Sequence, residues 1–173
     1  YSNYVKYSGD IVVGVVDGGI DYNHEDLKDN MWHNPDKTGD NIYGYNFATS
    51  SYAIHAEDHG THVAGTIAAA NNNGTGVCGV AGGNAAKKIK GAKLMSCQIF
   101  DGKKQGNGAE AIKWSADHGA HISQNSWGYI NLTTTPNSLK QAVDYFIANA
   151  GVDSNGNQTG PMKGGVVIFA AGN

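Results

Sequence analysis

Short runs of apolar residues alternate along the chain with longer stretches of helical character. The apolar runs are rich in β-branched or large side chains and end at glycine or polar residues, which predicts buried strands. One longer stretch is alanine-rich, one ends at a glycine, and one repeats its apolar residues at the spacing of a helix face. The predicted strands are Ile11–Val16, Leu94–Phe100, His121–Asn125 and Val166–Ala170, and the predicted helices are His59–Asn71, Ala109–His118 and Ser138–Ala150.

This alternation is typical of βαβ units, whose right-handed crossovers place helices on both faces of a parallel sheet. At 173 residues the chain is expected to form one domain, residues 1–173. We therefore predict an α/β fold with a three-layer, doubly wound parallel sheet. Functional residues gather at the carboxyl ends of the strands in such sheets. Asp17, Ser126 and Asn173 follow three of the predicted strands and should share one site.

Composition narrows the function classes. Hydrophobic residues make up 40% and charged residues 16%, with 25 glycines, which favours a compact fold with many tight turns over disorder. The net charge is −3, and all twelve basic residues are lysines. Their one local group, Lys87, Lys88, Lys90 and Lys93, is interpreted as a solvated turn rather than a nucleic-acid patch.

No apolar run is long enough to cross a membrane, and no signal peptide is evident. The first residue is Tyr1 rather than Met, so we expect a processed or trimmed product. Cys97 lies within an apolar strand pattern and is expected to be a buried free thiol. A bridge between Cys78 and Cys97 stays open at this stage.

Three residues supply the parts of an acyl-transfer site. Asp17 ends a buried strand, where a carboxylate needs a partner such as a histidine N–H; it could equally cap a turn. His59 stands at a helix start among small residues, although a lone histidine is usually structural. Asn173 follows a strand and could donate to a developing oxyanion, although Gly-Asn is also an ordinary turn.

The surrounding segments resemble the subtilisin family of serine proteases. The matching segments are VVGVVDGGIDYNHEDL (12–27), DHGTHVAGT (58–66), SQNSWG (123–128) and VVIFAAGN (166–173). The resemblance implies that Asp17 is the acid of a catalytic triad, that His59 rather than His62 is the general base, and that Asn173 is the oxyanion donor. It further implies a polypeptide substrate and a secreted, extracytoplasmic location.

The chain departs from the family pattern in one respect. The family's serine lies in a Gly-Thr-Ser-Met-Ala-like segment after the oxyanion asparagine, and these 173 residues contain no such segment. Ser126 matches a pocket-lining position and is not nominated as the nucleophile. We therefore expect an incomplete domain that is inactive alone. Its uncovered sheet edge should bind the missing C-terminal part of its own domain or lead to self-association.

Other segments match binding features of the family. Gly106, Asn107 and Gly108 resemble the substrate-aligning segment, and Ser126, Trp127 and Gly128 resemble a wall of the primary specificity pocket. Residues 70–77 (ANNNGTGV) resemble a structural calcium loop. The implied calcium ligands are the Asp26 carboxylate, the Asn72 side chain and the carbonyls of Ala70, Thr75 and Val77. The spacing of Asp153, Asn155 and Asn157 is interpreted as a solvated surface loop.

Two other functions compete with this interpretation. A pseudoprotease or peptide-binding scaffold would keep the groove and lack the serine. Metal-dependent hydrolysis would use Asp58, His59 and His62, because a His-x-x-His pair on a helix can bind zinc; neither a third ligand nor a glutamate base is obvious.

Overall fold

The structure is a computed structural model that describes residues 9–129, 133–152, 155–160 and 162–172. Asn173 and Asp153 lie outside these residues. The described part contains a mostly parallel sheet with the strand order β2-β3-β1-β5-β6, and β4 pairs with β3 in a hairpin. The strands are β1 (Val12–Gly18), β2 (Gly44–Asn46), β3 (Lys93–Asp101), β4 (Lys104–Gln105), β5 (Ile122–Asn125) and β6 (Val166–Phe169).

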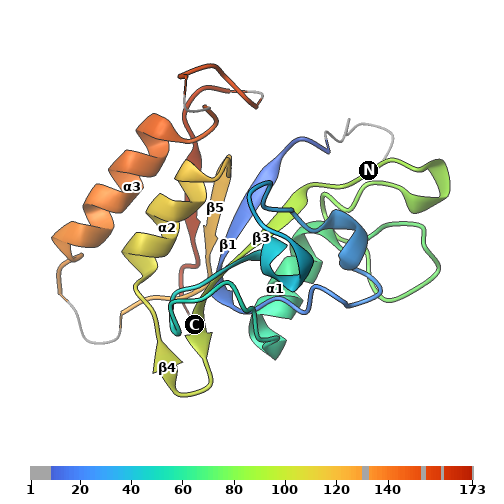
Figure 1. Ribbon diagram of the computed structural model, residues 1–173, viewed down its shortest axis with the longest axis horizontal. Helices are drawn as coiled ribbons and strands as arrows, with labels where there is room; N and C mark the ends of the chain where they lie inside the picture. The colour runs from blue at the N-terminus through green and yellow to red at the C-terminus, as the bar shows by residue number, and fades with distance from the viewer. Residues whose placement is uncertain (1–8, 130–132, 153–154, 161, 173) are drawn as a thin grey trace.

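Helices cover both faces of this sheet (Figure 1). Helices α2 (Gly108–Asp117) and α3 (Asn137–Asn149) lie side by side on one face, and α1 (Asp58–Ala68) lies on the other. Side chains of β1 alternate between the two cores: Val12 and Val16 pack on the α2 and α3 side, whereas Val13 and Val15 pack on the α1 side. The predicted three-layer α/β arrangement is therefore confirmed.

The central position of β1 explains its composition. It pairs in parallel with β3 on one side and β5 on the other, and all seven of its residues are buried. A strand covered on both faces reads as a continuous apolar run. A Cβ added at Gly14 would lie 2.9 Å from the Cβ of Ser115, so the glycine lets α2 approach the sheet closely.

All four predicted strands are present, with ends that differ from the prediction by at most two residues. Helix α1 ends at Ala68, three residues before the predicted end at Asn71. The alanine-rich run could continue as helix, but Ala69 is extended and the Ala70 N–H donates to the Asp26 carbonyl. A tertiary contact overrides local propensity here. The short strands β2 and β4 and three 3₁₀ turns at Lys28–Asn30, Gly39–Ile42 and Ala85–Lys87 were not predicted.

The described residues also bear on the expectations about the cysteines, the lysine group and membrane-spanning segments. Both cysteines are free, so the Cys78–Cys97 bridge does not form; Cys97 is buried, and burial raises the pKa of its thiol. Lys87, Lys88 and Lys90 are exposed around a short turn, as expected of a solvated segment. None of the described helices has the length and apolar character needed to cross a membrane.

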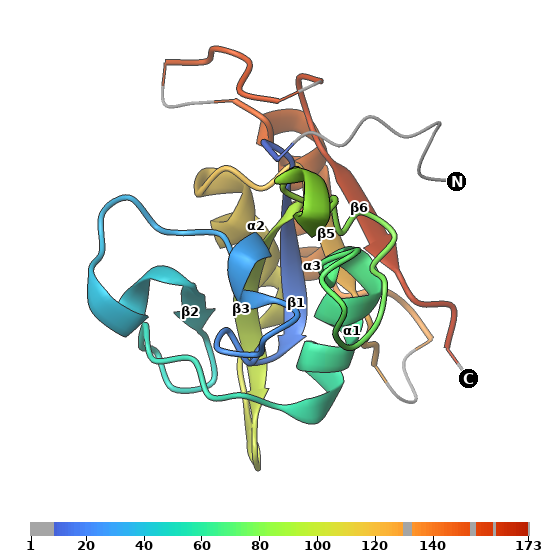
Figure 2. The same cartoon turned by 90° about the vertical axis from the view of Figure 1, so that its right-hand side faces the viewer.

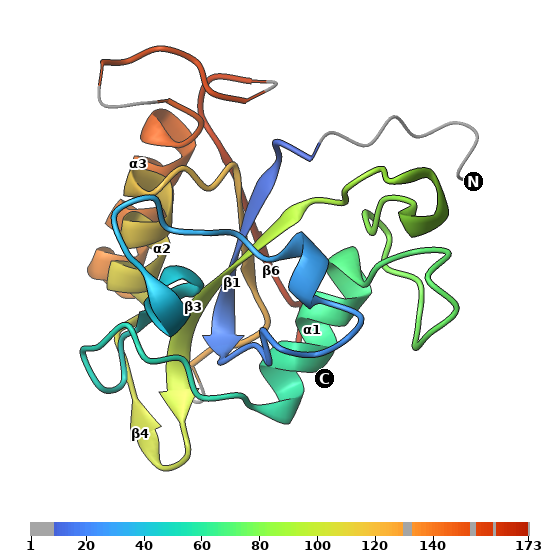
Figure 3. The same cartoon turned by 45° about the vertical axis from the view of Figure 1, so that its right-hand side comes forward.

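The carboxyl end of the sheet is the end that carries the predicted site. Figures 2 and 3 show that α1 begins beside the tip of the β1 arrow, and the β3–β4 hairpin extends from the same end. The parallel register places the end of β1 next to the end of β5. Asp17, the start of α1 and the residues after β5 therefore come together although they are far apart in sequence.

Candidate active site

Asp17 stands at the end of β1, where its backbone leaves regular pairing with β3. The register shifts between Asp17, opposite Gln98, and Gly18, opposite Phe100. Such a bulge bends the strand and redirects side chains. Asp17 is 1% exposed. Its Oδ1 accepts a hydrogen bond of 2.7 Å from the Gly18 N–H, whereas Oδ2 is buried and has no hydrogen-bond partner in the described structure.

His59 reaches this carboxylate from the second residue of α1. Its Nδ1 lies 2.7 Å from Asp17 Oδ1. An ionised carboxylate can only accept, so this contact places the proton of the neutral ring on Nδ1. Nε2 is then the nitrogen that can exchange a proton with a bound molecule. The imidazole is 68% exposed, and so it stays accessible from solvent while Asp17 holds its orientation.

Gly60 allows α1 to start at this place. A Cβ added at Gly60 would lie 2.1 Å from the carbonyl oxygen of Gly18, well inside contact distance. The glycine after His59 therefore lets the first turn of the helix pack directly on the end of β1. This close approach brings the His59 imidazole to the Asp17 carboxylate. It explains why a glycine follows the histidine in the HGTH segment.

A cavity of about 600 Å³ opens beside the Asp17–His59 pair. It contains the three residues predicted as the wall of the primary pocket, Ser126, Trp127 and Gly128. Four other side chains were not predicted: Glu57, Phe100, Gln105 and Tyr129. Glu57 could have been noticed as an acidic residue two positions before the base. Phe100 ends a predicted strand and Tyr129 follows one, and that placement is their only sequence signal; Gln105 ends β4, which was not predicted, and has no such signal.

The second predicted substrate segment lies elsewhere. Gly106, Asn107 and Gly108 do not line the cavity, whereas the preceding Gln105 does. The Gly106 N–H donates to the Ile99 carbonyl, and Asn107 Oδ1 caps α2 by accepting from Ala109 N and Glu110 N. A Cβ on Gly108 would meet the Trp127 ring at 2.4 Å. In this structure the segment starts the helix and supports Trp127, so its direct contact with a substrate stays a prediction.

Ser126 lies in the cavity wall but is not bonded to the base. Its Oγ accepts from Gln124 Nε2 at 2.6 Å. No serine hydroxyl of the described residues forms a hydrogen bond with His59. The contact between Asp17 and His59 is therefore formed, and no serine is among the described hydrogen-bond partners of His59.

The predicted calcium loop surrounds a buried carboxylate. Asp26 is 2% exposed; its Oδ1 accepts from Asn73 Nδ2 at 2.6 Å and its Oδ2 accepts from Val77 N at 2.9 Å. Asn72, whose side chain was predicted as a calcium ligand, is exposed and has a φ of 58°, and its role stays a prediction. The left-handed conformation at Asn72 turns the chain so that Asn73 contacts Asp26. Asn73 meets Asp26 through its Nδ2, and its Oδ1 accepts from the Thr75 N–H at 3.2 Å. A carboxylate and amide oxygens are the kind of ligand that calcium takes, and calcium binding here stays a prediction.

The residues of α1 do not form a metal site with other described side chains. The described residues contain no group of three or more histidine, cysteine, aspartate or glutamate side chains arranged to hold a metal ion. His59 Nδ1 is engaged by Asp17, and His62 is exposed one turn further along the helix. The alternative based on Asp58, His59 and His62 therefore gains no support.

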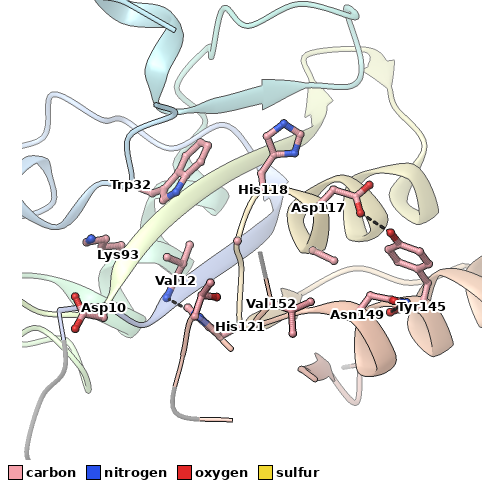
Figure 4. Close-up of a pocket in the computed structure, with 13 residues that line it drawn as sticks. Asp10, Val12, Trp32, Lys93, Asp117, His118, His121, Tyr145, Asn149 and Val152 are labelled. Atoms are coloured by element: carbon pink, nitrogen blue, oxygen red, sulfur yellow. Dashed lines mark hydrogen bonds between the residues drawn. The ribbon is translucent and has the colours of Figure 1, made fainter. Parts of the chain in front are cut away.

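A second cavity, of about 710 Å³, lies at the opposite end of the strands (Figure 4). His121 precedes β5 and is 4% exposed; its Nδ1 accepts from the Val12 N–H at 3.0 Å, and its Nε2 is buried without a partner. Burial lowers the pKa of His121 below its ordinary value of 6.5, and the negative charge of Asp10 opposes this effect. Neither the cavity nor this histidine was predicted.

Comparison with known proteins decides the family. The family model described as Peptidase_S8, subtilase family, matches residues 8–173. The chain belongs to the subtilase family. The subtilase match covers both residues of the acid–base pair and nearly the whole chain. It agrees with the earlier resemblance, which rested on short segments of sequence alone.

Curated relatives of this subtilase chain are proteases. The thermophilic serine proteinase of Bacillus sp. strain AK1 is 32% identical over 99% of this chain and 37% of its own length. Fervidolysin of Fervidobacterium pennivorans is 37% identical over 78% of this chain and 18% of its own length. The halolysin-like extracellular serine protease Nep of Natrialba magadii is 37% identical over 69% of this chain and 21% of its own length. The chain thus spans well under half of these relatives.

Solved structures confirm the fold. The epidermin leader peptide processing serine protease of Staphylococcus aureus superposes with a TM-score of 0.58 at 19% identity, over 83% of this chain and 36% of that protein. The nisin leader peptidase of Lactococcus lactis gives a TM-score of 0.55 at 23% identity, over 88% of this chain and 44% of that protein. At this level of identity the likeness concerns architecture.

Proposed function

We propose that this chain supplies the acid and the base of a serine endopeptidase that hydrolyses polypeptides through an acyl-enzyme. The observation that carries the proposal is the 2.7 Å contact between His59 Nδ1 and Asp17 Oδ1 at the edge of an open cavity. In this role His59 Nε2 accepts the proton of a serine hydroxyl and later donates it to the leaving amine. Asp17 keeps the ring oriented and stabilises the imidazolium. Asn173 is proposed as the oxyanion donor.

The nucleophile is proposed to come from a serine-bearing segment such as the family has after its oxyanion asparagine. Without it, the 173 residues should not form an acyl-enzyme, because Ser126 is bonded to Gln124 rather than to His59. The missing part of the domain is then the expected partner of this chain. An extracellular location is proposed with it, since one relative is an extracellular protease.

Calcium is proposed as a structural ion of the loop at residues 70–77. Asp26, the side-chain oxygen of Asn73 and the carbonyls of Ala70, Thr75 and Val77 would hold it. Bound there, the ion would add positive charge beside a buried carboxylate and tie the loop to the turn before the first 3₁₀ segment. The residues themselves already link Asp26 to Asn73 and Val77 by hydrogen bonds.

The test compares two proteins. The first is the chain itself, and the second is the same chain continued by the serine-bearing segment of the Bacillus sp. strain AK1 proteinase. Both are treated with a fluorophosphonate, which labels activated serines, and with fluorogenic peptides. We expect no labelling and no cleavage by the first, and both by the second. Labelling of the 173-residue chain would show that it contains its own nucleophile.

The pseudoprotease alternative predicts a different result. The continued protein would fold and bind peptides without labelling or cleavage. Circular dichroism and a cooperative unfolding transition distinguish that outcome from a chimera that does not fold. The variant His59→Ala of the continued protein should be folded and inactive; activity that survives this change would contradict the assignment of the base.

A further inference from the structure

We propose that Glu57 gives the cavity beside His59 a preference for peptides with a lysine or arginine side chain close to the bond that is cut. This inference rests on the proposed function, because it assumes that the cavity binds a polypeptide. It adds a specificity-determining residue that the match to the family does not assign. The argument concerns the position of Glu57, its fixed carboxylate and the charges around it.

Glu57 lies between the base and the end of β1. It is the residue before α1, and it lines the same cavity as Asp17 and His59. Its backbone N–H donates to the Gly19 carbonyl at 2.8 Å. A Cβ added at Gly18 would lie 2.7 Å from the Cβ of Glu57, which shows how closely its side-chain stem packs on the strand end. The stem therefore has little freedom to leave the cavity wall.

The carboxylate of Glu57 is held on its other side by the β3–β4 hairpin. Its Oε1 accepts a hydrogen bond of 2.9 Å from the Gly102 N–H, at the turn of that hairpin. The side chain forms no cap with the N–H groups of α1, although it stands at the N-cap position. No hydrogen bond of the described residues uses Oε2. The carboxylate is thus oriented by a backbone donor and keeps one oxygen for a ligand.

The charged side chains that line the cavity are acidic in the described structure, whereas Lys103 and Lys104 follow Gly102 on the hairpin that holds Glu57. Of the residues that line it, Asp17 and Glu57 are the acidic ones, and no lysine lines it. Asp17 is engaged by His59. The Asp101 carboxylate, on the same hairpin, already accepts from Asn46 Nδ2 at 2.9 Å and contacts His55 Nδ1 at 2.8 Å. Both contacts use Oδ2 of Asp101, which does not line the cavity. Because Asp17 is bonded to His59 and its second oxygen is buried, Glu57 is the lining carboxylate that can reach a cation in the described structure.

A substrate cation would meet a fixed partner at this place. A Lys ammonium or Arg guanidinium that reaches Oε2 forms a charge-assisted hydrogen bond, which is stronger than a neutral one. The site is open to water, so screening reduces the gain. We expect roughly tenfold tighter binding for a basic side chain than for an uncharged one of the same length.

The test measures binding rather than cleavage, so it uses the chain as it is. Fluorescein-labelled hexapeptides that carry one lysine, moved through each position, are compared with the same peptides carrying norleucine, which has the same length and no charge. Fluorescence anisotropy gives the affinities for the unaltered chain, for Glu57→Gln, and for Glu110→Gln as a matched control. Glu110 lies on α2 and does not line the cavity.

We expect at least one position where the lysine peptide binds roughly tenfold more tightly than the norleucine peptide. This preference should be lost in Glu57→Gln and retained in Glu57→Asp and Glu110→Gln. It should weaken from 0.05 to 0.5 M salt, because the Debye length becomes about threefold shorter. Equal binding of lysine and norleucine peptides by the unaltered chain would overturn the inference and leave the proposed function standing. An equal loss of both peptides in Glu57→Gln would assign a structural role and also overturn it. Failure of every peptide to bind would count against the peptide cleft itself, and the inference would fall with it.

Discussion

Asp17 Oδ1 and His59 Nδ1 lie 2.7 Å apart although 42 residues separate them in the chain. The strand end supplies the carboxylate, and the close packing of α1 on that strand supplies the imidazole. Each residue has an ordinary structural explanation by itself. Their contact at the edge of an open cavity makes them an oriented acid–base pair.

The pair predicts the effect of Asp17→Asn. An amide in place of the carboxylate no longer holds a proton on His59 Nδ1, so the downfield proton signal expected for that hydrogen bond should disappear from the NMR spectrum. In the protein continued by the serine-bearing segment, kcat should fall by about 10⁴, the effect known for the acid of serine protease triads. Asp58→Asn, at an exposed neighbour of His59, is the control and should change neither signal nor rate.

Two glycines of α1 predict opposite effects of the same substitution. Gly60→Ala places a Cβ 2.1 Å from the Gly18 carbonyl oxygen and should lower the free energy of unfolding by about 1–3 kcal/mol. At Gly65 an added Cβ meets nothing within 4 Å, and Gly65→Ala should raise that free energy by about 1 kcal/mol through helix propensity. Urea unfolding measures both. Equal destabilisation by the two changes would contradict this packing of α1 on β1.

Much of this site could be predicted from sequence, for identifiable reasons. Asp17 follows an uninterrupted apolar run, and His59 stands among small residues at a helix start, so both local signals survive in the fold. Contacts made by distant residues could not be predicted. Glu57 joins the cavity because Gly102 holds it, and the second cavity exists because Val12 and His121 meet at the starts of two strands.

Two features of the structure depend on backbone conformation and could not be predicted. Asn72 and Asn73 are indistinguishable as residue types, and only the φ of 58° at Asn72 decides which of them contacts Asp26. Strand β2 has the sequence GYN, which lacks the apolar pattern of a strand, and it forms because β3 offers it partners some 50 residues later. Neither feature leaves a local trace in the sequence.

The Asp26 loop predicts a response to calcium. Because a ligand that binds the folded state stabilises it by mass action, millimolar calcium should raise the Tm of the unaltered chain. Asn73→Ala should abolish this rise and Asn72→Ala should leave it intact, since Asn73 is the residue that contacts Asp26. Thermal melts with calcium and with a chelator measure the shift. The reverse order of the two variants would restore the ligand set predicted from sequence.

The exposed side of β6 predicts association. β6 ends the strand order, and Val166, Ile168 and Phe169 are 41%, 50% and 39% exposed. Sheet edges with apolar side chains favour contact with another chain. Sedimentation equilibrium should show concentration-dependent association of the 173-residue chain that Ile168→Lys weakens. Ile147→Lys, at a similarly exposed residue of α3, is the control; an unaltered chain that stays monomeric would contradict the prediction.

His121 predicts a loss of stability in acid. Burial lowers its pKa in the folded chain, so the unfolded chain binds the proton more readily. Its contribution to stability is complete above its ordinary pKa of 6.5 and decreases as the pH falls below that value. Protonation of Nδ1 also removes the acceptor of the Val12 N–H. Urea unfolding at several values from about pH 5 to 8 gives the free energy of unfolding as a function of pH. This free energy should change less with pH in His121→Gln than in the unaltered chain or in the control His118→Gln.

The central place of β1 has a consequence for synthesis. It precedes the other described strands of the sheet, and its partners β3 and β5 follow roughly 80 and 110 residues later. At about 5–20 residues per second, the Val12–Val16 segment waits on the order of ten seconds for its neighbours. During that interval an apolar segment that is buried in the folded sheet has no strand beside it. The nascent chain should therefore depend on chaperones that bind short apolar segments, before Asp17 has met His59.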